Sequence, residues 1–381
     1  MQPTHRYLSN LTPLRGIAAI WVFVFHFNGV MIHFITPGST HLIDKGYLMV
    51  DLFFIMSGFI ICHVYRQSFE SGLTLKNFQK FIVARFARIY PLHLFVLIIL
   101  ILWVAKLGTG GLDSVFDPAA IPSNLLLIHS FGIQKVFTWN VPSWSISAEW
   151  WAYMVFPFLI IFLYHMQKLA ADLLFLFVII SYLAIMFWLP RKDPFDPSVI
   201  VPHNLDSTFD YGYLRGLAGF IGGMLVYKIY ETGLFRNISQ KDMTAIPIIL
   251  ITLFCLHIGI NDGFYMILFA LVVYAFACNN EKLHFICNNR LAQYLGKISY
   301  SIYLNGMIIA MFFFMGFIKL PGVQYSDTTG ATTDFLTGAG YCLIVMLIQI
   351  GLSSLTYYGV EKPCRKYINK KLGKETMPVY A

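Results

Sequence analysis

Arg15 and His26 are the two residues whose types and spacing first suggest chemistry. They lie eleven residues apart in the first strongly apolar stretch of the chain, residues 14–34. In an α-helix this spacing makes three turns plus about 20°, so both side chains lie on one face, about 16 Å apart along the axis. The stretch is long enough to span a membrane, with the imidazole near mid-membrane. Ionisable groups at that depth are costly and usually functional, although a hydrogen-bonded core histidine explains His26 alone equally well.

Two further arginines, Arg85 and Arg88, lie on one face of a later helix. They are spaced i, i+3 at the start of the apolar stretch 82–106, so their side chains are neighbours. Together with Arg15 they bring three guanidinium groups to one predicted cytosolic surface, where such groups bind phosphates in a bidentate manner. The alternative is that they only anchor their helices at the membrane surface.

Two carboxylates lie near the outer ends of predicted membrane spans. Asp51 is surrounded by apolar and aromatic residues and needs a partner, so it is either half of a structural pair or a site residue. Glu149 follows Trp144 and precedes Trp150 and Trp151. Tryptophans gather at membrane interfaces, but indole rings beside a carboxylate also suit a sugar-binding or acid–base site.

The composition is that of a polytopic membrane protein. Of the 381 residues, 57% are hydrophobic and 12% are charged, which is too apolar for a soluble domain of this size. The net charge of +8 comes mostly from cations on predicted cytosolic segments, so nucleic acid is not an expected partner. The histidines show no HxxxH pattern and no His–Glu pair at metal-binding spacing, so no metal site is predicted.

The predicted fold class is an all-α, polytopic integral membrane protein with about ten transmembrane helices. With the N-terminus in the cytosol, 20 of the 27 lysines and arginines fall on cytosolic segments, as the positive-inside rule requires, and both termini are expected there. One transmembrane domain is predicted over residues 8–368, in contact with the lipid bilayer, followed by a basic cytosolic tail, 369–381. The predicted spans are 14–34, 47–65, 82–106, 145–165, 170–189, 211–230, 243–260, 263–280, 291–318 and 335–358.

Five sequence blocks occur in an order that is specific for one family. They are Leu14-Arg15-Gly16 with His26, Val50-Asp51 to Ser57-Gly58-Phe59, Arg85 to Pro91, Trp144-Ser145 to Glu149, Tyr153 and Pro157, and Leu295-Gly296 to Tyr303-Leu304, with Val360 to Pro363 after them. With these blocks the chain resembles acyltransferase family 3, whose integral membrane acyltransferases include O-antigen and nodulation-factor O-acetyltransferases. The resemblance spans about residues 8–368. The family often has a histidine shortly after the Tyr-Leu pair, where this chain has Asn305-Gly306, so no role for such a histidine is carried over.

The resemblance implies transfer of an acyl group, most simply acetyl, from cytosolic acyl-CoA to a hydroxyl of a carbohydrate or lipid-linked glycan at or beyond the outer face of a bacterial cytoplasmic membrane. Acyl-CoA is then the donor substrate, and no metal is implied. In this scheme Arg15, Arg85 and Arg88 bind the coenzyme. His26, as general base, Glu149 and Asp51 are the catalytic candidates. Trp144, Ser145, Trp151 and Tyr153 are the expected contacts of the acceptor.

Two interpretations from other classes stay open on the sequence alone. Intramembrane His, Asp and Glu also occur in proton-coupled secondary transporters, although the two halves of the chain show no repeat. A non-catalytic component of a glycan-export complex is the second alternative. The oligomeric state is not indicated.

Overall fold

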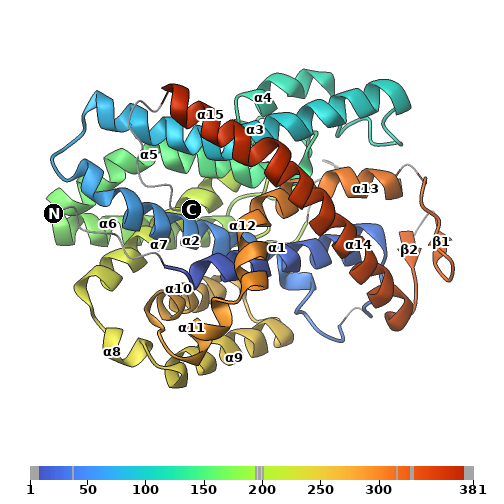
Figure 1. Cartoon of the computed structure of the whole chain (residues 1–381). Coiled ribbons are helices and arrows are strands. Elements are labelled where there is room, and N and C mark those ends of the chain that lie inside the picture. The colour runs from blue at the N-terminus through green and yellow to red at the C-terminus, as the bar shows by residue number, and fades with distance from the viewer. Residues whose placement is uncertain are drawn as a thin grey trace.

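Long helices, arranged roughly along one direction, make up most of this protein (Figure 1). The computed structural model describes residues 8–36, 38–193, 195, 199, 201–314, 316–326 and 330–372. The α-helices are α1 (Leu11–His26), α2 (Met49–Tyr65), α3 (Leu75–Leu107), α4 (Ile121–Leu125), α5 (Trp144–His165), α6 (Gln167–Phe187), α7 (Gly212–Thr232), α8 (Arg236–Ser239), α9 (Asp242–Ile258), α10 (Asp262–Cys278), α11 (Lys282–Cys287), α12 (Arg290–Leu304), α13 (Gly306–Phe314), α14 (Phe335–Thr356) and α15 (Lys362–Leu372). Two short strands, β1 (Gln324–Ser326) and β2 (Gly330–Thr332), pair antiparallel.

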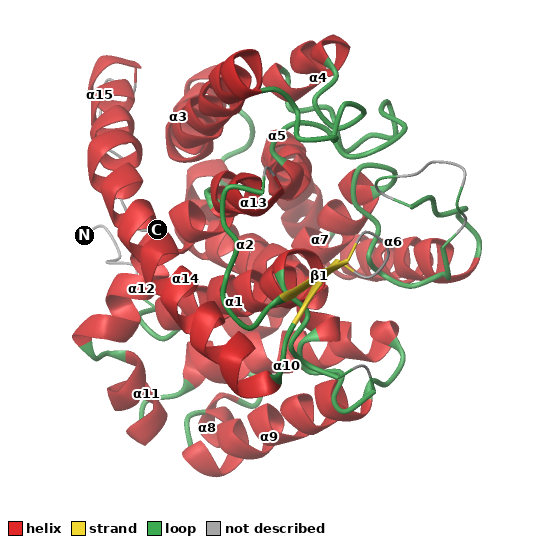
Figure 2. Ribbon diagram, turned by 90° about the vertical axis from the view of Figure 1, so that its right-hand side faces the viewer, coloured by secondary structure: helices red, strands yellow, loops and turns green. Residues whose placement is uncertain are grey.

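Helices α1, α2 and α7 lie at the centre, and the other long helices surround them (Figure 2). Helix α2 packs along α7, and α1 packs along α12. Glycines allow both close approaches: a Cβ added at Gly223 would meet the backbone of Ile55 and Phe59, and one added at Gly16 would meet the Gly296 nitrogen at 2.8 Å. Small residues at such crossings are typical of membrane helices, because they bring backbones together.

Helix α1 ends at His26 and is followed directly by a π-helical turn, Phe27–Met31. The side chain of Asn28 then accepts hydrogen bonds from the backbone N–H groups of Phe34 and Ile35, both at 3.1 Å. This cap satisfies backbone donors after the helix ends. It also fixes the path of the chain directly after His26.

Helices α12 and α13 form a broken pair, bent by 50° at Asn305. A break inside a membrane domain leaves backbone carbonyls without helical partners, and these must be satisfied by protein. Gln349 donates to the Ile302 carbonyl at 2.5 Å, and Asn140 donates to the Leu304 carbonyl at 3.3 Å. Polar side chains of neighbouring segments therefore hold the break in place.

The all-α fold class is confirmed, whereas the count of ten spans is not. Within the described part of the chain, six helices are long and apolar enough to cross a membrane, or seven if the bent pair counts as one. Each of the ten predicted stretches is largely helical, but α9 and α10 have only 17 residues each, and α7 includes a buried arginine and several glycines. The cytosolic location of the termini stays a prediction, and residues 373–381 of the predicted tail lie outside the described residues.

Candidate active site

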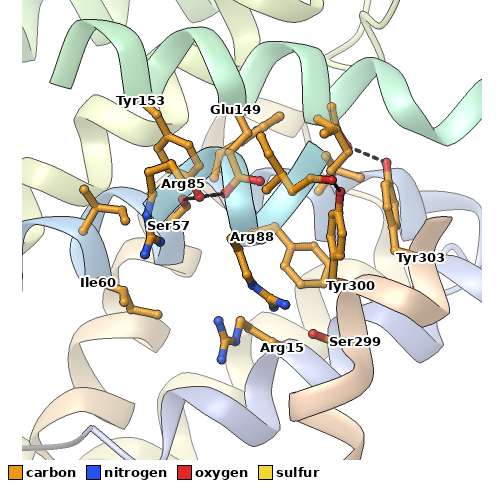
Figure 3. Close-up of a pocket in the computed structure, with 17 residues that line it drawn as sticks. Arg15, Ser57, Ile60, Arg85, Arg88, Glu149, Tyr153, Ser299, Tyr300 and Tyr303 are labelled. Carbon is orange, nitrogen blue, oxygen red and sulfur yellow. Dashed lines mark hydrogen bonds between the residues drawn. The ribbon is translucent and has the colours of Figure 1, made fainter. Parts of the chain in front are cut away.

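The three arginines singled out in the sequence line one cavity. Figure 3 shows Arg15, Arg85 and Arg88 around it, with Glu149 and Tyr153 beside Arg85 and the two tyrosines of α12 on the opposite side. We refer to it as the arginine cavity. Its lining residues are Arg15, Val50, Phe53, Phe54, Ser57, Ile60, Ile61, Arg85, Arg88, Ile89, Ser145, Ile146, Glu149, Tyr153, Ser299, Tyr300 and Tyr303.

Buried aromatic and acidic side chains position the arginines of α3. Arg85 donates to the Tyr65 hydroxyl at 2.8 Å, and its guanidinium carbon lies 5.0 Å from the centre of that ring. Arg88 forms an ion pair with Glu361, which is 1% exposed, and lies 5.3 Å from the centre of the Tyr300 ring. Cationic groups over aromatic faces are stabilised without losing their charge. Tyr65 thus holds Arg85 in place, and Glu361 and Tyr300 hold Arg88.

Glu149, predicted near the outer end of its span, lines the arginine cavity. Its carboxylate accepts hydrogen bonds from the Ser57 hydroxyl at 2.7 Å and from the Tyr153 hydroxyl. The Ser57 and Tyr153 hydroxyl oxygens are 3.1 Å apart. The predicted acceptor contact Tyr153 therefore shares this cavity with the predicted coenzyme ligands.

His26 lines a second cavity, which we call the histidine cavity. His26 Nδ1 lies 2.9 Å from the Val22 carbonyl. Because a carbonyl oxygen can only accept, Nδ1 carries the hydrogen, and the lone pair of the neutral ring is on Nε2. The residues lining this cavity are Ala19, Val22, Phe23, Phe25, His26, Val30, Met31, Tyr47, Val50, Phe137, Val141, Pro142, Trp144, Phe195, Asp206, Thr208, Ile302, Tyr303, Gly306, Met307 and Ala310.

The two cavities adjoin each other. Val50 of α2 and Tyr303 of α12 line both, so the cavities meet at these side chains. Arg15 and His26, from the two ends of α1, therefore line different compartments. The helix face that is predicted to carry Arg15 and His26 therefore borders two cavities and not one continuous tunnel.

The structure brings Asp51 into neither cavity. Its carboxylate accepts hydrogen bonds from Arg215 Nε at 3.0 Å and from a terminal guanidinium nitrogen at 2.6 Å. Both side chains are completely excluded from solvent. Of the two interpretations of Asp51, this geometry favours the structural pair.

The remaining predicted acceptor contacts are dispersed. Trp144 lines the histidine cavity and packs under Arg215, 5.1 Å from ring centre to guanidinium carbon. Ser145 lines the arginine cavity, and its hydroxyl oxygen lies 2.9 Å from the Tyr303 hydroxyl oxygen. Trp151 lines neither cavity, and its indole N–H donates to the Leu127 carbonyl at 2.9 Å. Trp151 therefore anchors a loop rather than the site.

The sequence interpretation assigned no role to Arg215, Glu361, Asp206 or Tyr303. Arg215 lies inside the predicted span 211–230, so the depth argument applied to Arg15 applies to it as well. Glu361 and Tyr303 belong to the family blocks, but the sequence carries no separate signal for a role of either residue. Asp206 lies in the loop between α6 and α7, whose sequence carries no signal for a site. In the described residues, no group of three or more His, Cys, Asp and Glu side chains is arranged to hold a metal ion.

These features define a helical membrane protein with an arginine-lined cavity and a histidine-lined cavity in contact. The family model of the acyltransferase domain of acyltransferase family 3 matches residues 9–357. The chain belongs to this family. No solved structure significantly matches the chain.

Two bacterial relatives illustrate the similarity. The O-acetyltransferase OatA of Staphylococcus aureus is 24% identical over 397 residues, which cover 95% of this chain and 58% of OatA. The acyltransferase MdmB of Streptomyces mycarofaciens is 32% identical over 164 residues, which cover 41% of this chain and 40% of MdmB. The matched regions thus span about two fifths to three fifths of these relatives.

Proposed function

We propose that this protein transfers an acyl group, most simply acetyl, from cytosolic acyl-CoA to a hydroxyl of a carbohydrate acceptor at the outer side of a bacterial cytoplasmic membrane. One observation carries the proposal: a cavity with three arginines adjoins a cavity with a histidine, and Val50 and Tyr303 line both. Family membership supports acyl transfer over solute transport or a purely structural role in glycan export. The name of the O-acetyltransferase relative supports acetyl as the group transferred.

The arginine cavity is the proposed donor site. Coenzyme A carries phosphates, and guanidinium groups bind phosphate through paired N–H donors. Arg15, Arg85 and Arg88 supply such groups. Apolar side chains such as Phe53, Phe54 and Ile60 line the rest of this cavity and suit the largely uncharged arm that carries the thioester.

His26 is the proposed general base. Its Nε2 has the lone pair, because Nδ1–H is held by the Val22 carbonyl. The imidazole removes the proton from the acceptor hydroxyl as the oxygen attacks the thioester carbonyl carbon. The carbon–sulfur bond then breaks, and the imidazolium returns the proton to the sulfur of coenzyme A. The ring ends neutral, and no further reactant is needed.

The histidine cavity is the proposed acceptor site. Trp144, Phe137 and Phe195 line it, and aromatic rings present flat apolar surfaces that complement the C–H faces of a sugar. Asp206 and Thr208 add hydrogen-bonding groups that suit sugar hydroxyls.

The test is acyl transfer by the purified protein in proteoliposomes supplied with acetyl-CoA labelled in the acetyl group. The acceptors are lipid-linked and soluble glycans extracted from the cells that produce the protein. We expect the label to appear on a glycan and free coenzyme A to be released in equal amount. If no extracted acceptor is labelled, the proposal is wrong. Uptake of labelled acetyl-CoA into the vesicles would then indicate a transporter.

A further inference from the structure

We infer that Tyr303 is a further catalytic residue, whose phenol hydrogen stabilises the negative charge on the acyl oxygen during transfer. The inference rests on the proposed function, because it assigns a role in that same reaction. Acyl transfer passes through a tetrahedral state in which the carbonyl oxygen carries negative charge, and one well-placed hydrogen-bond donor there is a large contribution to catalysis.

The position of Tyr303 is the first argument. It comes from α12, one residue before that helix ends at Leu304 and the chain bends. Its side chain lines both the arginine cavity and the histidine cavity. A thioester that enters from the arginine side and a hydroxyl beside His26 must meet at this partition. Val50 also lines both cavities, but its side chain has no hydrogen-bonding group.

The hydrogen bonding of Tyr303 is the second argument. The Ser145 and Tyr303 hydroxyl oxygens are 2.9 Å apart, and Figure 3 draws a hydrogen bond of Tyr303 as a dashed line. Ser145 Oγ also lies 3.2 Å from the Pro142 carbonyl. A serine hydroxyl has one hydrogen and a carbonyl can only accept, so when Ser145 donates to Pro142, the phenol of Tyr303 donates to Ser145. When the Ser145 hydroxyl turns to donate to Tyr303 instead, the phenol hydrogen is available to a substrate oxygen.

The other tyrosines of the arginine cavity are engaged differently. Tyr300 donates to the Ile89 carbonyl at 2.5 Å, and Tyr153 donates to the Glu149 carboxylate. Their phenol hydrogens are therefore committed to protein acceptors. Tyr303 differs because its partner, the Ser145 hydroxyl, can donate as well as accept, and because Tyr303 also lines the histidine cavity.

The chemical role is compatible with the proton transfers already described. A phenol is protonated at neutral pH, since its ordinary pKa is about 10. Tyr303 donates a hydrogen bond to the thioester oxygen and strengthens it as charge develops, while His26 takes the hydroxyl proton. When the carbonyl re-forms and the carbon–sulfur bond breaks, the phenol keeps its hydrogen. Tyr303 therefore undergoes no net change.

Tyr303→Phe is the direct test, because it removes one oxygen and keeps the ring that separates the cavities. We expect turnover to fall about 10²- to 10³-fold, with the affinity for coenzyme A unchanged. Tyr341→Phe is the matched control, because its hydroxyl donates to the Pro321 carbonyl away from the site, and this variant should keep wild-type turnover. A Tyr303→Phe protein that binds coenzyme A normally and turns over like wild type would overturn the inference.

Ser145→Ala and a fluorinated tyrosine at position 303 distinguish a catalytic role from a structural one. Ser145→Ala removes the Ser–Tyr hydrogen bond but leaves the phenol, so it should reduce turnover less than Tyr303→Phe. Fluorination lowers the pKa of the phenol, so turnover should fall at a lower alkaline pH than in the unmodified protein. An unshifted pH profile, or equal losses in Ser145→Ala and Tyr303→Phe, would assign Tyr303 a packing role instead. Failure of the proposed function differs, because wild type would then transfer no label.

Discussion

Asp51 and Arg215 form an ion pair in which Asp51 Oδ2 lies 2.6 Å from a guanidinium nitrogen and neither side chain is exposed to solvent. Arg215 also donates to the carbonyls of Tyr47 and Ser207, at 3.0 and 3.1 Å. One guanidinium group thereby ties α7 to the start of α2 and to the loop between α6 and α7. Because removing one partner leaves a buried charge uncompensated, Arg215→Met should lower the free energy of unfolding by about 3–5 kcal/mol.

Thermal unfolding of the detergent-purified protein measures this loss. The double variant Asp51→Leu with Arg215→Met removes the fully buried carboxylate together with its partner, and the other partner of Arg215, Asp206, is 35% exposed, so the double variant should be more stable than Arg215→Met alone. If the double variant is stable but has no turnover per folded molecule, the pair of Asp51 and Arg215 is needed for acyl transfer itself and not only for stability.

The interface between α2 and α7 depends on Gly223, whereas the adjacent Gly222 is dispensable. A Cβ added at Gly223 would overlap the Ile55 carbonyl and lie 2.8 Å from the Phe59 nitrogen. At Gly222 no atom of the described residues lies within 4 Å of the added carbon. Gly223→Ala should therefore lower stability by about 1–3 kcal/mol, and Gly222→Ala should be neutral or stabilising by up to about 1 kcal/mol. Equal melting temperatures for the two variants would contradict this packing.

His26→Ala should insert and fold normally but lose acyl transfer by about 10²- to 10⁴-fold, the usual contribution of a general base. His165→Ala is a suitable control, because His165 makes the same ring-to-carbonyl contact, with Ile161 at 2.9 Å, on an exposed helix end. Initial rates at saturating acetyl-CoA measure the effect. A well-expressed His26→Ala protein with wild-type rates would remove His26 from the mechanism.

Arg85→Ala should weaken coenzyme A binding more than it slows saturated turnover. A charge-assisted hydrogen bond contributes about 1.5–3 kcal/mol, which corresponds to roughly a 10- to 100-fold loss of affinity. The loss should shrink as salt rises, because salt screens the interaction with phosphate. Isothermal titration with coenzyme A at two salt concentrations provides the measurement.

Arg236→Ala is the matched control for Arg85→Ala. Arg236 also lies over a tyrosine ring, with its guanidinium carbon 5.1 Å from the centre of Tyr230, but it is not part of the arginine cavity. Its replacement should leave the affinity for coenzyme A unchanged. Comparable losses in the two variants would indicate a general effect of surface charge rather than a phosphate site.

Composition and periodicity were sufficient to predict a helical membrane protein and the gathering of Arg15, Arg85 and Arg88. Apolar stretches of this length have few alternatives to helix in lipid. The i, i+3 spacing of Arg85 and Arg88 fixes their common face. Such patterns predict the direction in which a side chain leaves its own helix. For Arg15, Arg85 and Arg88 that direction was sufficient, because all three line one cavity.

Contacts between distant segments could not be predicted in this way. The spacing of Arg15 and His26 gave their common face, but not that Val50 and Tyr303, from other helices, lie at the partition between them. Asp51 meets a partner 164 residues away. The sequence predicts Glu149 only near the outer end of a span, whereas the structure shows that it lines the cavity of the three arginines and accepts from Ser57 and Tyr153.

Val50 and Tyr303 line both cavities. Under the proposed function, this contact has a consequence for how a cell modifies glycans outside its membrane. Activated thioesters are made inside, and an exported one would be lost by dilution and hydrolysis. Under the proposed function the nucleotide stays in the compartment that regenerates it, and only the two-carbon unit passes outward. The barrier crossed is then the width of a few side chains, so no separate exporter for the coenzyme is required.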